Sequence, residues 1–314
     1  MSESLPAPAR LRLSVIVLNY RTPHLVLDCV GSVLPELDPT RDAIAVVDNA
    51  SGDDSAEAIR SAAVEQGWKG VRVVESARNG GFAAGNNVGI RALSAQAYLL
   101  LNSDTLVRPG AIGWLLEALD ADPRVGLVSP RLEWPDGTPQ ISCFRLHSPW
   151  SELIDAAGTG PVRKLLERWD VPLPVSDTPC EVPWTSFAAV MIRAAVLDQV
   201  GLLDEGFFMY YEDEDYCRRA ARAGWRIRHE PRARVVHLRG GTSPVKALSA
   251  ARKRRPRYYY AARSRCFRKA YGPLGLVAAN LLYSVGRAIA WCRELVSDKE
   301  WHAVERELLD VWRG

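Results

Sequence analysis

The sequence predicts an α/β fold built on a doubly wound, mostly parallel sheet, and three observations support this. Apolar runs alternate with segments of helical spacing from residue 12 to residue 129, as in consecutive βαβ units. The first run, 12–18, is apolar almost without a break, which is typical of a strand buried on both faces. Asn, Asp and Gly residues follow four of the predicted strands, at the edge where open α/β sheets bind ligands.

The elements are expected in strict alternation over the first half of the chain. Strands are predicted over 12–18, 43–47, 71–75, 98–102 and 125–129, and helices over 22–34, 54–66, 83–94 and 111–119. Thr22 with Pro23 is a helix-start signal, and Pro109 precedes the fourth helix. Further on, the pattern predicts an extended stretch at 182–193, helices at 197–200 and 214–223, and two short strands at 226–229 and 233–237. Residues 131–180 have no clear period and are expected to be irregular.

The C-terminal part is basic and helical. Residues 222–271 hold 16 Lys and Arg against one acid, a balance of +15, whereas the remaining 24 bases and 36 acids give −12. Such a basic region predicts an anionic partner: nucleotide phosphates, nucleic acid or a membrane surface. Residues 244–257 are expected to be a basic loop or helix, and 258–270 a helix. The apolar stretch 274–292 reaches the length of about 17–25 residues that a membrane span needs, but a core or interfacial amphipathic helix is favoured.

The cysteines and the N-terminus favour a cytoplasmic protein. The six cysteines form no C-x-x-C pair or zinc pattern, and the first residues are polar, without the apolar run of a signal peptide. We expect a catalytic domain over 1–240, with a nucleotide-binding half at 12–105 and an acceptor half at 106–240. A basic helical region over 241–314, suited to contact with a membrane, would follow it.

Polar residues at the predicted strand ends form the candidate nucleotide site. They are Asn19-Tyr20, Asp48-Asn49, Asn79 to Phe82 and Asn102 to Asp104, with Asn86 one turn into the next helix. A carboxylate such as Asp48 can accept a hydrogen bond from a pyrimidine ring N–H, although Asp, Asn and Ser are also common turn and capping residues. Asp104 suits Mg²⁺ or Mn²⁺, which prefer oxygen ligands and bridge phosphates, or it caps the next turn.

A second candidate site lies at the acids 212–215, which follow the aromatic run 207–211. Acids at a helix start are favoured by the helix dipole. A carboxylate beside apolar surface also has a raised pKa and can act as a general base, the interpretation we favour here. His237 ends an apolar strand and is either structural or a metal ligand. Trp184 and Ser186 could line an acceptor pocket or belong to the core.

Taken in order, these segments resemble family 2 glycosyltransferases of the GT-A fold, and most of all the bacterial rhamnosyltransferase-type members that build cell-surface polysaccharides. The matching segments are 15–22, 46–55, 79–87, 99–105, 201–219, 223–225 and 233–237. The resemblance implies a nucleotide-sugar site, a metal site, a catalytic pair and an acceptor site. The expected nucleotide-sugar residues are Asn19, Tyr20, Asp48, Asn49, Asn79, Gly80, Phe82, Asn86, Asn102, Ser103 and Asp104.

The resemblance also assigns chemical roles. Asp104, the last residue of the family's D-x-D motif, and His237 would hold the Mg²⁺ or Mn²⁺. Asp213 would be the catalytic base, with Glu212 orienting the acceptor beside Trp184, Ser186 and Asp215. Arg239 and Lys246 would close over the phosphates. One position departs from the motif, because Asn102 replaces its first acid and removes a charge from the metal site.

The resemblance implies an inverting transfer at the cytoplasmic face of the inner membrane. The donor would be a dTDP- or UDP-sugar, with dTDP-rhamnose as first choice, and the acceptor a glycan or a polyprenyl-diphosphate-linked sugar. Four alternatives stay open: a UDP-sugar-dependent family member of other specificity, a nucleic-acid-binding protein using 252–269, a member that binds donor without catalysis, and a nucleotidyltransferase. Nucleic acid is not the expected partner, and an oligomer is compatible with the sequence.

Overall fold

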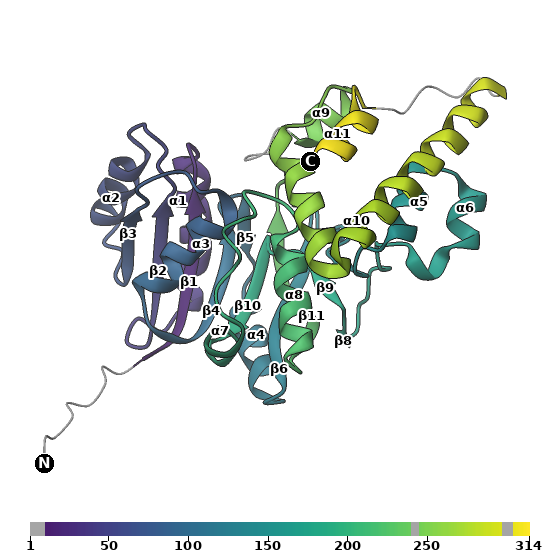
Figure 1. Ribbon diagram of the computed structural model, residues 1–314. Helices are drawn as coiled ribbons and strands as arrows, with labels where there is room; N and C mark the ends of the chain where they lie inside the picture. Colours follow the sequence, from purple (N-terminus) through teal and green to yellow (C-terminus); the bar gives the residue numbers. More distant parts are fainter. Residues whose placement is uncertain (1–9, 240–244, 297–303) are drawn as a thin grey trace, which may run out of the picture.

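The computed structural model describes residues 10–239, 245–296 and 304–314, and its centre is one nine-stranded sheet (Figure 1). The strand order is β3-β2-β1-β4-β10-β6-β11-β5, and β8 pairs with β11 outside this path. The first four strands are parallel, as expected. The second half is mixed, because β10 runs antiparallel to both β4 and β6, while β6 and β11 are parallel.

The elements of the first half follow the predicted alternation. They are β1 (Leu11–Asn19), α1 (Pro23–Val33), β2 (Asp42–Asp48), α2 (Ser55–Glu65), β3 (Val71–Glu75), α3 (Gly81–Ala92), β4 (Ala95–Asn102), β5 (Thr105–Val107), α4 (Ala111–Asp120) and β6 (Val125–Glu133). The short strand β5 was not predicted. The second half comprises β7 (Cys143–Phe144), α5 (Pro149–Ala157), α6 (Gly160–Leu165), β8 (Cys180–Glu181), β9 (Trp184–Thr185), β10 (Ala189–Arg193), α7 (Ala194–Val200), α8 (Glu212–Arg222), β11 (Arg226–His237), α9 (Val245–Ala250), α10 (Arg257–Val296) and α11 (Glu307–Arg313).

Helices cover both faces of the sheet, which gives the chain two hydrophobic layers. On one face, Leu13, Val15 and Val17 of β1 pack with side chains from α1, α2 and α4. On the other face, Ile16 packs with α3, α7 and α8. Alternate residues of one strand therefore serve opposite layers, as the period-two geometry of a strand requires. The expectation of a doubly wound α/β architecture is confirmed.

Two sequence expectations need correction. The strands expected at 226–229 and 233–237 are one strand, β11, with a register shift between Glu230 and Arg234 where it pairs with β6. The stretch 131–180, expected to be irregular, contains α5 and α6. Helix α5 begins with a capping box in which the side chains of Ser148 and Ser151 each accept from the other's backbone N–H.

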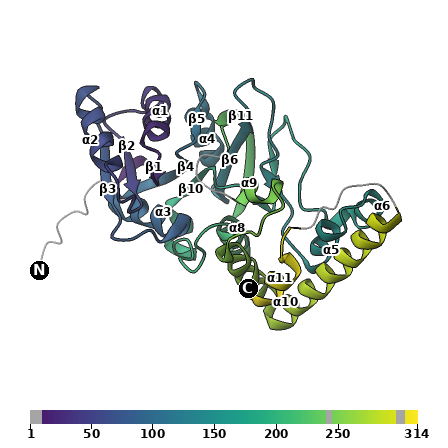
Figure 2. The ribbon, with the colours of Figure 1, turned by 90° about the horizontal axis from the view of Figure 1, so that it is seen from above.

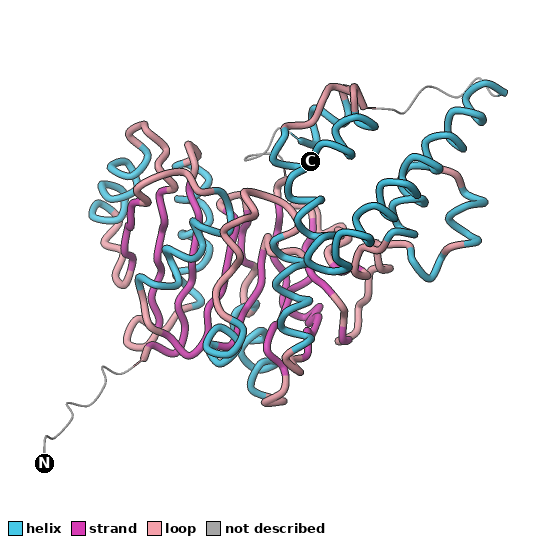
Figure 3. Tube along the Cα trace, in the orientation of Figure 1, coloured by secondary structure: helices cyan, strands magenta, loops and turns pink. Residues whose placement is uncertain are grey.

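The C-terminal region is dominated by α10, which bends at Gly272 (φ 72°) just before Pro273. Its second half runs alongside α5 and leads away from the sheet, as Figures 1 and 2 both show. Figure 3 shows the strands gathered on one side of the molecule and this bent helix outside them. By length and apolarity alone, α10 from Arg257 to Leu295 qualifies as a helix that could cross a membrane.

Candidate active site

The carboxyl ends of β1 and β2 hold a buried hydrogen-bond cluster centred on Asp48. Asn19 and Asp48 are opposite each other in the parallel register, and Asn19 Nδ2 donates to Asp48 Oδ1 over 2.7 Å. Ser51 donates to the same carboxylate from its hydroxyl (2.5 Å) and its backbone N–H (3.0 Å). All three residues are buried, so the Asp48 carboxylate is held in one orientation at this edge.

Asn49 and Asn86 extend this cluster toward α3. Asn49 Nδ2 donates to the side chain of Asn79 and to the carbonyl of Gly81, each over 3.1 Å. Asn86 Nδ2 donates to the carbonyl of Phe82. The Oδ1 atoms of Asn49 and Asn86 are buried and have no hydrogen-bond partner within the described part of the chain. Since buried acceptors are normally satisfied, these two atoms are suited to a donor from a ligand or water.

The Gly80-Gly81 turn lies close to the protein backbone of the segment before α8. A Cβ at Gly81, whose φ is +85°, would lie 1.9 Å from the carbonyl oxygen of Phe208. The next residue, Phe82, donates its N–H to that same oxygen over 2.7 Å. The absence of a side chain at Gly81 therefore allows the β3–α3 turn to pack against the aromatic segment 207–211, which precedes α8. Gly80 has an ordinary φ of −90°.

The remaining strand-end residues lie at the same edge of the sheet. Tyr20 is 36% exposed, and the guanidinium of Arg21 lies 5.2 Å from its ring centroid. Asn102 is partly exposed at the end of β4, and the buried Ser103 hydroxyl lies 3.2 Å from that of Thr22.

Asp104 and His237 are brought together by the pairing of β5 with β11. His237 is opposite Thr105 in that register, and its Nε2 lies 3.5 Å from Oδ1 of the buried Asp104. Gln140 Nε2 donates to the His237 carbonyl over 2.7 Å and so fixes the strand end. His237 Nδ1 is buried without a hydrogen-bond partner among the described residues.

This pair fits a divalent cation only as a partial ligand set. No group of three or more His, Cys, Asp and Glu side chains arranged for a metal occurs in the described ranges. With only one carboxylate oxygen and one imidazole nitrogen as protein ligands, most coordination positions of the cation would be open to water and phosphate oxygens. This is usual for Mg²⁺ and Mn²⁺ at phosphate sites.

Glu212 and Asp213 occupy the first turn of α8, after two residues in a strained conformation. Tyr210 and Tyr211 have φ values of 75° and 65°, which bulky side chains rarely adopt and which are concentrated at functional sites. Burial raises the pKa of Asp213 to about 6, although the Glu214 N–H donates to its Oδ1 over 2.8 Å and opposes the rise. Burial, with the neighbouring Asp213, raises the pKa of Glu212 well above its usual value.

The other two acids of the cluster are held in ion pairs. Glu214 accepts from His147 and Arg218, and Asp215 accepts from Arg219 and Lys269. These contacts give Glu214 and Asp215 a part in fixing α8.

His147, at the start of α5, is a site residue that sequence analysis missed. Its ring lies between those of Trp184 and Tyr211, at centroid distances of 5.3 and 5.2 Å. Burial lowers its pKa, but the Glu214 carboxylate at 2.5 Å outweighs this, so the pKa of His147 is raised. The Trp184 side chain lies close enough to the Asp213 carboxyl to lower its pKa.

A cavity of about 400 Å³ opens beside His147 and Tyr211, between α5, α10 and α11. Its walls carry the arginines 255, 263, 287 and 293 together with three acids and several tyrosines. Arg263 is paired with Glu152 at 2.6 Å, and both side chains are buried. The basic segment 252–269 lines this cavity with Arg255, Tyr259, Tyr260 and Arg263, whereas its other Lys and Arg residues are exposed.

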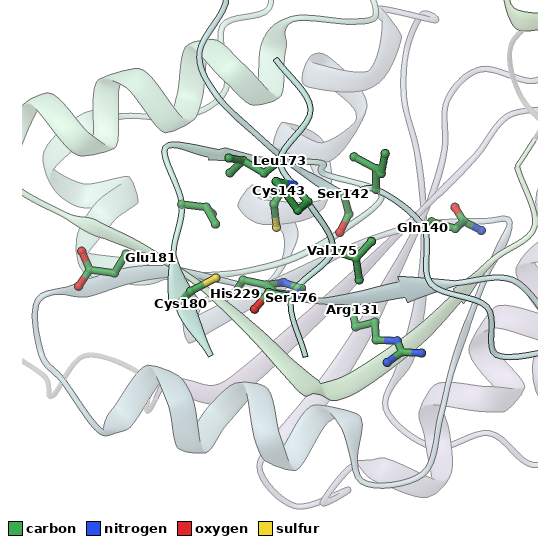
Figure 4. Close-up of a pocket in the computed structure, with 13 residues that line it drawn as sticks. Arg131, Gln140, Ser142, Cys143, Leu173, Val175, Ser176, Cys180, Glu181 and His229 are labelled. Atoms are coloured by element: carbon green, nitrogen blue, oxygen red, sulfur yellow. The ribbon is translucent and has the colours of Figure 1, made fainter. Parts of the chain in front are cut away.

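A smaller cavity, of about 190 Å³, is lined by residues of β6, β7, β8 and β11 and of the loops beside them (Figure 4). Gln140, Ser142 and Cys143 line it, and Gln140 also contacts His237 as described above. The Ser142 carbonyl accepts from the backbone N–H of Ser186, next to β9. Residues 140–142 therefore connect the Asp104–His237 pair to the end of β9. That strand carries Trp184, which lies beside Asp213.

Comparison with known proteins identifies the family. The sequence model described as "Glycosyltransferase like family 2" matches residues 8–272. The chain belongs to glycosyltransferase family 2. It is 28% identical, over 77% of its length and 81% of the relative's, to a Mycobacterium tuberculosis protein named N-acetylglucosaminyl-diphospho-decaprenol L-rhamnosyltransferase. It is 27% identical over 67% of its length, and 62% of the relative's, to the Haloferax volcanii hexosyltransferase Agl10.

Solved glycosyltransferases share its fold. The Pyrobaculum calidifontis mannosyltransferase PcManGT, in complex with GDP-Man and Mn²⁺, superposes with a TM-score of 0.56 at 15% identity. That match covers 97% of this chain and 87% of the mannosyltransferase. S. aureus TarS 1-349 in complex with UDP superposes with a TM-score of 0.53 at 15% identity. That match covers 91% of this chain and 72% of the TarS chain. This family 2 glycosyltransferase therefore has the GT-A-like fold expected from its sequence, and it is an enzyme that transfers a sugar from a nucleotide-sugar.

Proposed function

We propose that this family 2 glycosyltransferase transfers its sugar with inversion, with Asp213 as the general base. The observation that carries the proposal is the Asp213 carboxylate, which is placed at the start of α8 with its pKa raised to about 6. A base with a pKa near the working pH is both deprotonated and able to take a proton, which is the condition for efficient general-base catalysis.

The proposed reaction is a single displacement. Asp213 accepts the proton of the acceptor hydroxyl while that oxygen forms a bond to the anomeric carbon. The bond from the anomeric carbon to the diphosphate oxygen breaks, and the nucleoside diphosphate leaves with the electron pair. Asp104 and His237 would hold a divalent cation, which when bound neutralises charge on the diphosphate. Glu212, beside Asp213, would bind the acceptor in its protonated form, since its pKa is raised well above the usual value.

The proposed donor is a dTDP- or UDP-sugar, with dTDP-rhamnose as first choice. The orientation of Asp48 supports a pyrimidine, because a fixed carboxylate at the end of β2 can accept the ring N–H. Asn19, Tyr20, Asn49, Asn79, Gly80, Phe82, Asn86, Asn102 and Ser103 would complete this site. The name of the mycobacterial relative supports rhamnose, and UDP in the TarS complex supports the alternative of another UDP-sugar.

The proposed acceptor is a glycan or a polyprenyl-diphosphate-linked sugar at the cytoplasmic face of the inner membrane. The relative's name specifies a diphospho-decaprenol acceptor. The arginines of the larger cavity, which opens next to His147, are suited to a diphosphate. Trp184 and Ser186, on and after β9, would contact the acceptor sugar.

Binding and product analysis test these proposals together. Isothermal titration with dTDP and with UDP, each with and without Mn²⁺, should show tight binding of one nucleotide only when the metal is present. Turnover should release nucleoside diphosphate, whereas a nucleotidyltransferase would release inorganic diphosphate. A short oligonucleotide should not bind, because five of the cations in 252–269 are already held in ion pairs with acids of the protein. Tight oligonucleotide binding without nucleotide binding would contradict the proposal.

A further inference from the structure

The second half of α10 has an exposed face made only of apolar residues. From Pro273 to Leu295, no strongly exposed residue is charged or polar. The strongly exposed residues are Pro273, Leu274, Val277, Leu281, Val285, Ala288, Ile289, Trp291, Cys292 and Leu295. Leu274 is 84% exposed and Leu281 is 53% exposed. Apolar residues at a spacing of three to four along a helix form one continuous stripe, and a contiguous exposed patch of this kind marks an interaction surface.

The opposite face of the same helix is covered by α5. A Cβ at Gly286 would lie 2.7 Å from the carbonyl oxygen of Leu153, so the two backbones are in close contact. Asn280, on this inner face, accepts from Arg263, which is in turn paired with Glu152 of α5. The helix is therefore amphipathic, with its charged groups turned away from the strongly exposed apolar face. A span surrounded by lipid would place this buried ion pair and α5 inside the bilayer, which disfavours that arrangement.

Cations lie near both ends of the outer half of α10. Arg268 is exposed just before the bend at Gly272. Arg163 and Lys164 are exposed on α6, beside the outer part of α10 in Figures 1 and 2, and Arg293 Nη1 donates to the carbonyl of Gly158 at the turn before α6. Trp312 of α11 borders the stripe through its hydrogen bond to Ser284. Tryptophan and arginine beside an apolar stripe match the boundary between lipid headgroups and acyl chains.

We infer that the outer half of α10 docks this protein on an anionic membrane from one side, with the stripe from Leu274 to Leu295 sunk in the headgroup–acyl boundary. At 1.5 Å per residue this half is about 34 Å long, and it lies along the surface rather than across the bilayer. The inference deepens the proposed function, because it gives the surface by which the enzyme would reach a lipid-linked acceptor.

Vesicle co-sedimentation of the full-length protein tests the inference. The wild type should sediment with vesicles of phosphatidylcholine and phosphatidylglycerol, and less with phosphatidylcholine alone. Leu281→Glu combined with Val285→Glu should reduce the bound fraction roughly tenfold or more, since two side chains lose apolar burial and gain charge in lipid. The matched control is Val64→Glu, which places the same charge at an 81% exposed valine of α2 and should leave binding unchanged.

Cys292 provides a second readout on the same face. It is exposed, whereas Cys29, Cys143, Cys217 and Cys266 are buried, so a polarity-sensitive thiol dye in a Cys180→Ser background will label it selectively. Its emission should shift to the blue with anionic vesicles, and the shift should vanish in the Leu281→Glu, Val285→Glu variant. Arg163→Gln with Lys164→Gln should weaken binding to anionic vesicles and lower its sensitivity to salt.

Three results would overturn the inference. They are vesicle binding equal in the wild type and the double variant, retention in the membrane after carbonate extraction, and a dimer in solution that the double variant abolishes. The last would mean that a second copy of the chain covers the face. Binding of the nucleotide with Mn²⁺ is measured on the same samples without vesicles. Failure to bind the nucleotide would count against the proposed function alone. Nucleotide binding without vesicle binding would count against the membrane docking alone.

Discussion

Nε2 of His237 lies 3.5 Å from Oδ1 of Asp104, although the two residues come from opposite halves of the chain. The contact follows from strand register, because β11 pairs with β5 so that His237 faces Thr105. Replacing His237 by Ala should remove the extra thermal stability that Mn²⁺ with nucleotide gives the wild type, since a ligand that binds only the folded state raises the melting temperature. His24→Ala, at an exposed histidine of α1, is the matched control. An unchanged Mn²⁺ effect in the His237 variant would exclude this residue as a ligand.

Asp213→Asn should reduce sugar transfer by about 10²–10⁴-fold, the range for loss of a general base. Nucleotide affinity should stay within about twofold, because Asp213 lies on α8 and not among the strand-end residues. Transfer is measured by release of nucleoside diphosphate and affinity by calorimetry. Asp198→Asn, at an exposed acid of α7, should behave like the wild type. Transfer by the Asp213 variant at a comparable rate would assign the base elsewhere.

The pH profile of transfer should follow Asp213. The base must be ionised to act, and the pKa of Asp213 is about 6. The value of kcat/KM should therefore fall as the pH drops below about 6, tenfold per pH unit, and reach a plateau above about 7. In the Asp213→Asn variant, the residual kcat/KM should no longer fall in this way at low pH. A profile that stays flat to pH 5 would contradict a base with a raised pKa.

Gly81→Ala should destabilise the protein by about 2 kcal/mol or more in urea unfolding. A positive φ alone costs a non-glycine residue about 1–2 kcal/mol. At Gly81 the new Cβ also meets the Phe208 carbonyl at 1.9 Å. Gly52→Ala is the control, because Gly52 has φ +68° and no neighbour within 4 Å and so isolates the backbone cost. The Gly81 variant should also lose transfer, since Phe208 precedes the turn of α8 that carries Asp213, the proposed base. Equal stability losses in the two variants would exclude the close contact as a cause.

The elements up to residue 105 were predictable from sequence because they depend on local patterns. A buried strand such as β1 has a continuous apolar run, and the residue that follows it, Asn19, lies at a sheet edge whatever the rest of the chain does. The three-residue strand β5 was missed because it is too short to show a period.

The contacts within residues 106–240 were less predictable from the sequence, because they join residues that are far apart along the chain. His147 precedes a helix whose capping box has Ser151 where the usual pattern has Glu or Gln, so the helix start was not recognised. Its role depends on Glu214 and Tyr211, which only the folded chain brings beside it. In the same way, the glycines at 80 and 81 indicated a close approach, but the sequence could not show that the neighbour is Phe208.

Tyr271, at the bend of α10, connects this helix to α8 and to the segment that precedes α5. Its hydroxyl donates to the carbonyl of His147 over 2.6 Å and accepts from Arg218 over 3.2 Å. Arg218 belongs to the same helix as Asp213, so these two hydrogen bonds connect the bend of α10 to the helix that carries the proposed base. With the outer half of α10 resting on a membrane, this connection would hold the reacting hydroxyl at a fixed height above the membrane surface. Acceptors would then be sorted by the length of glycan between their lipid and their free hydroxyl.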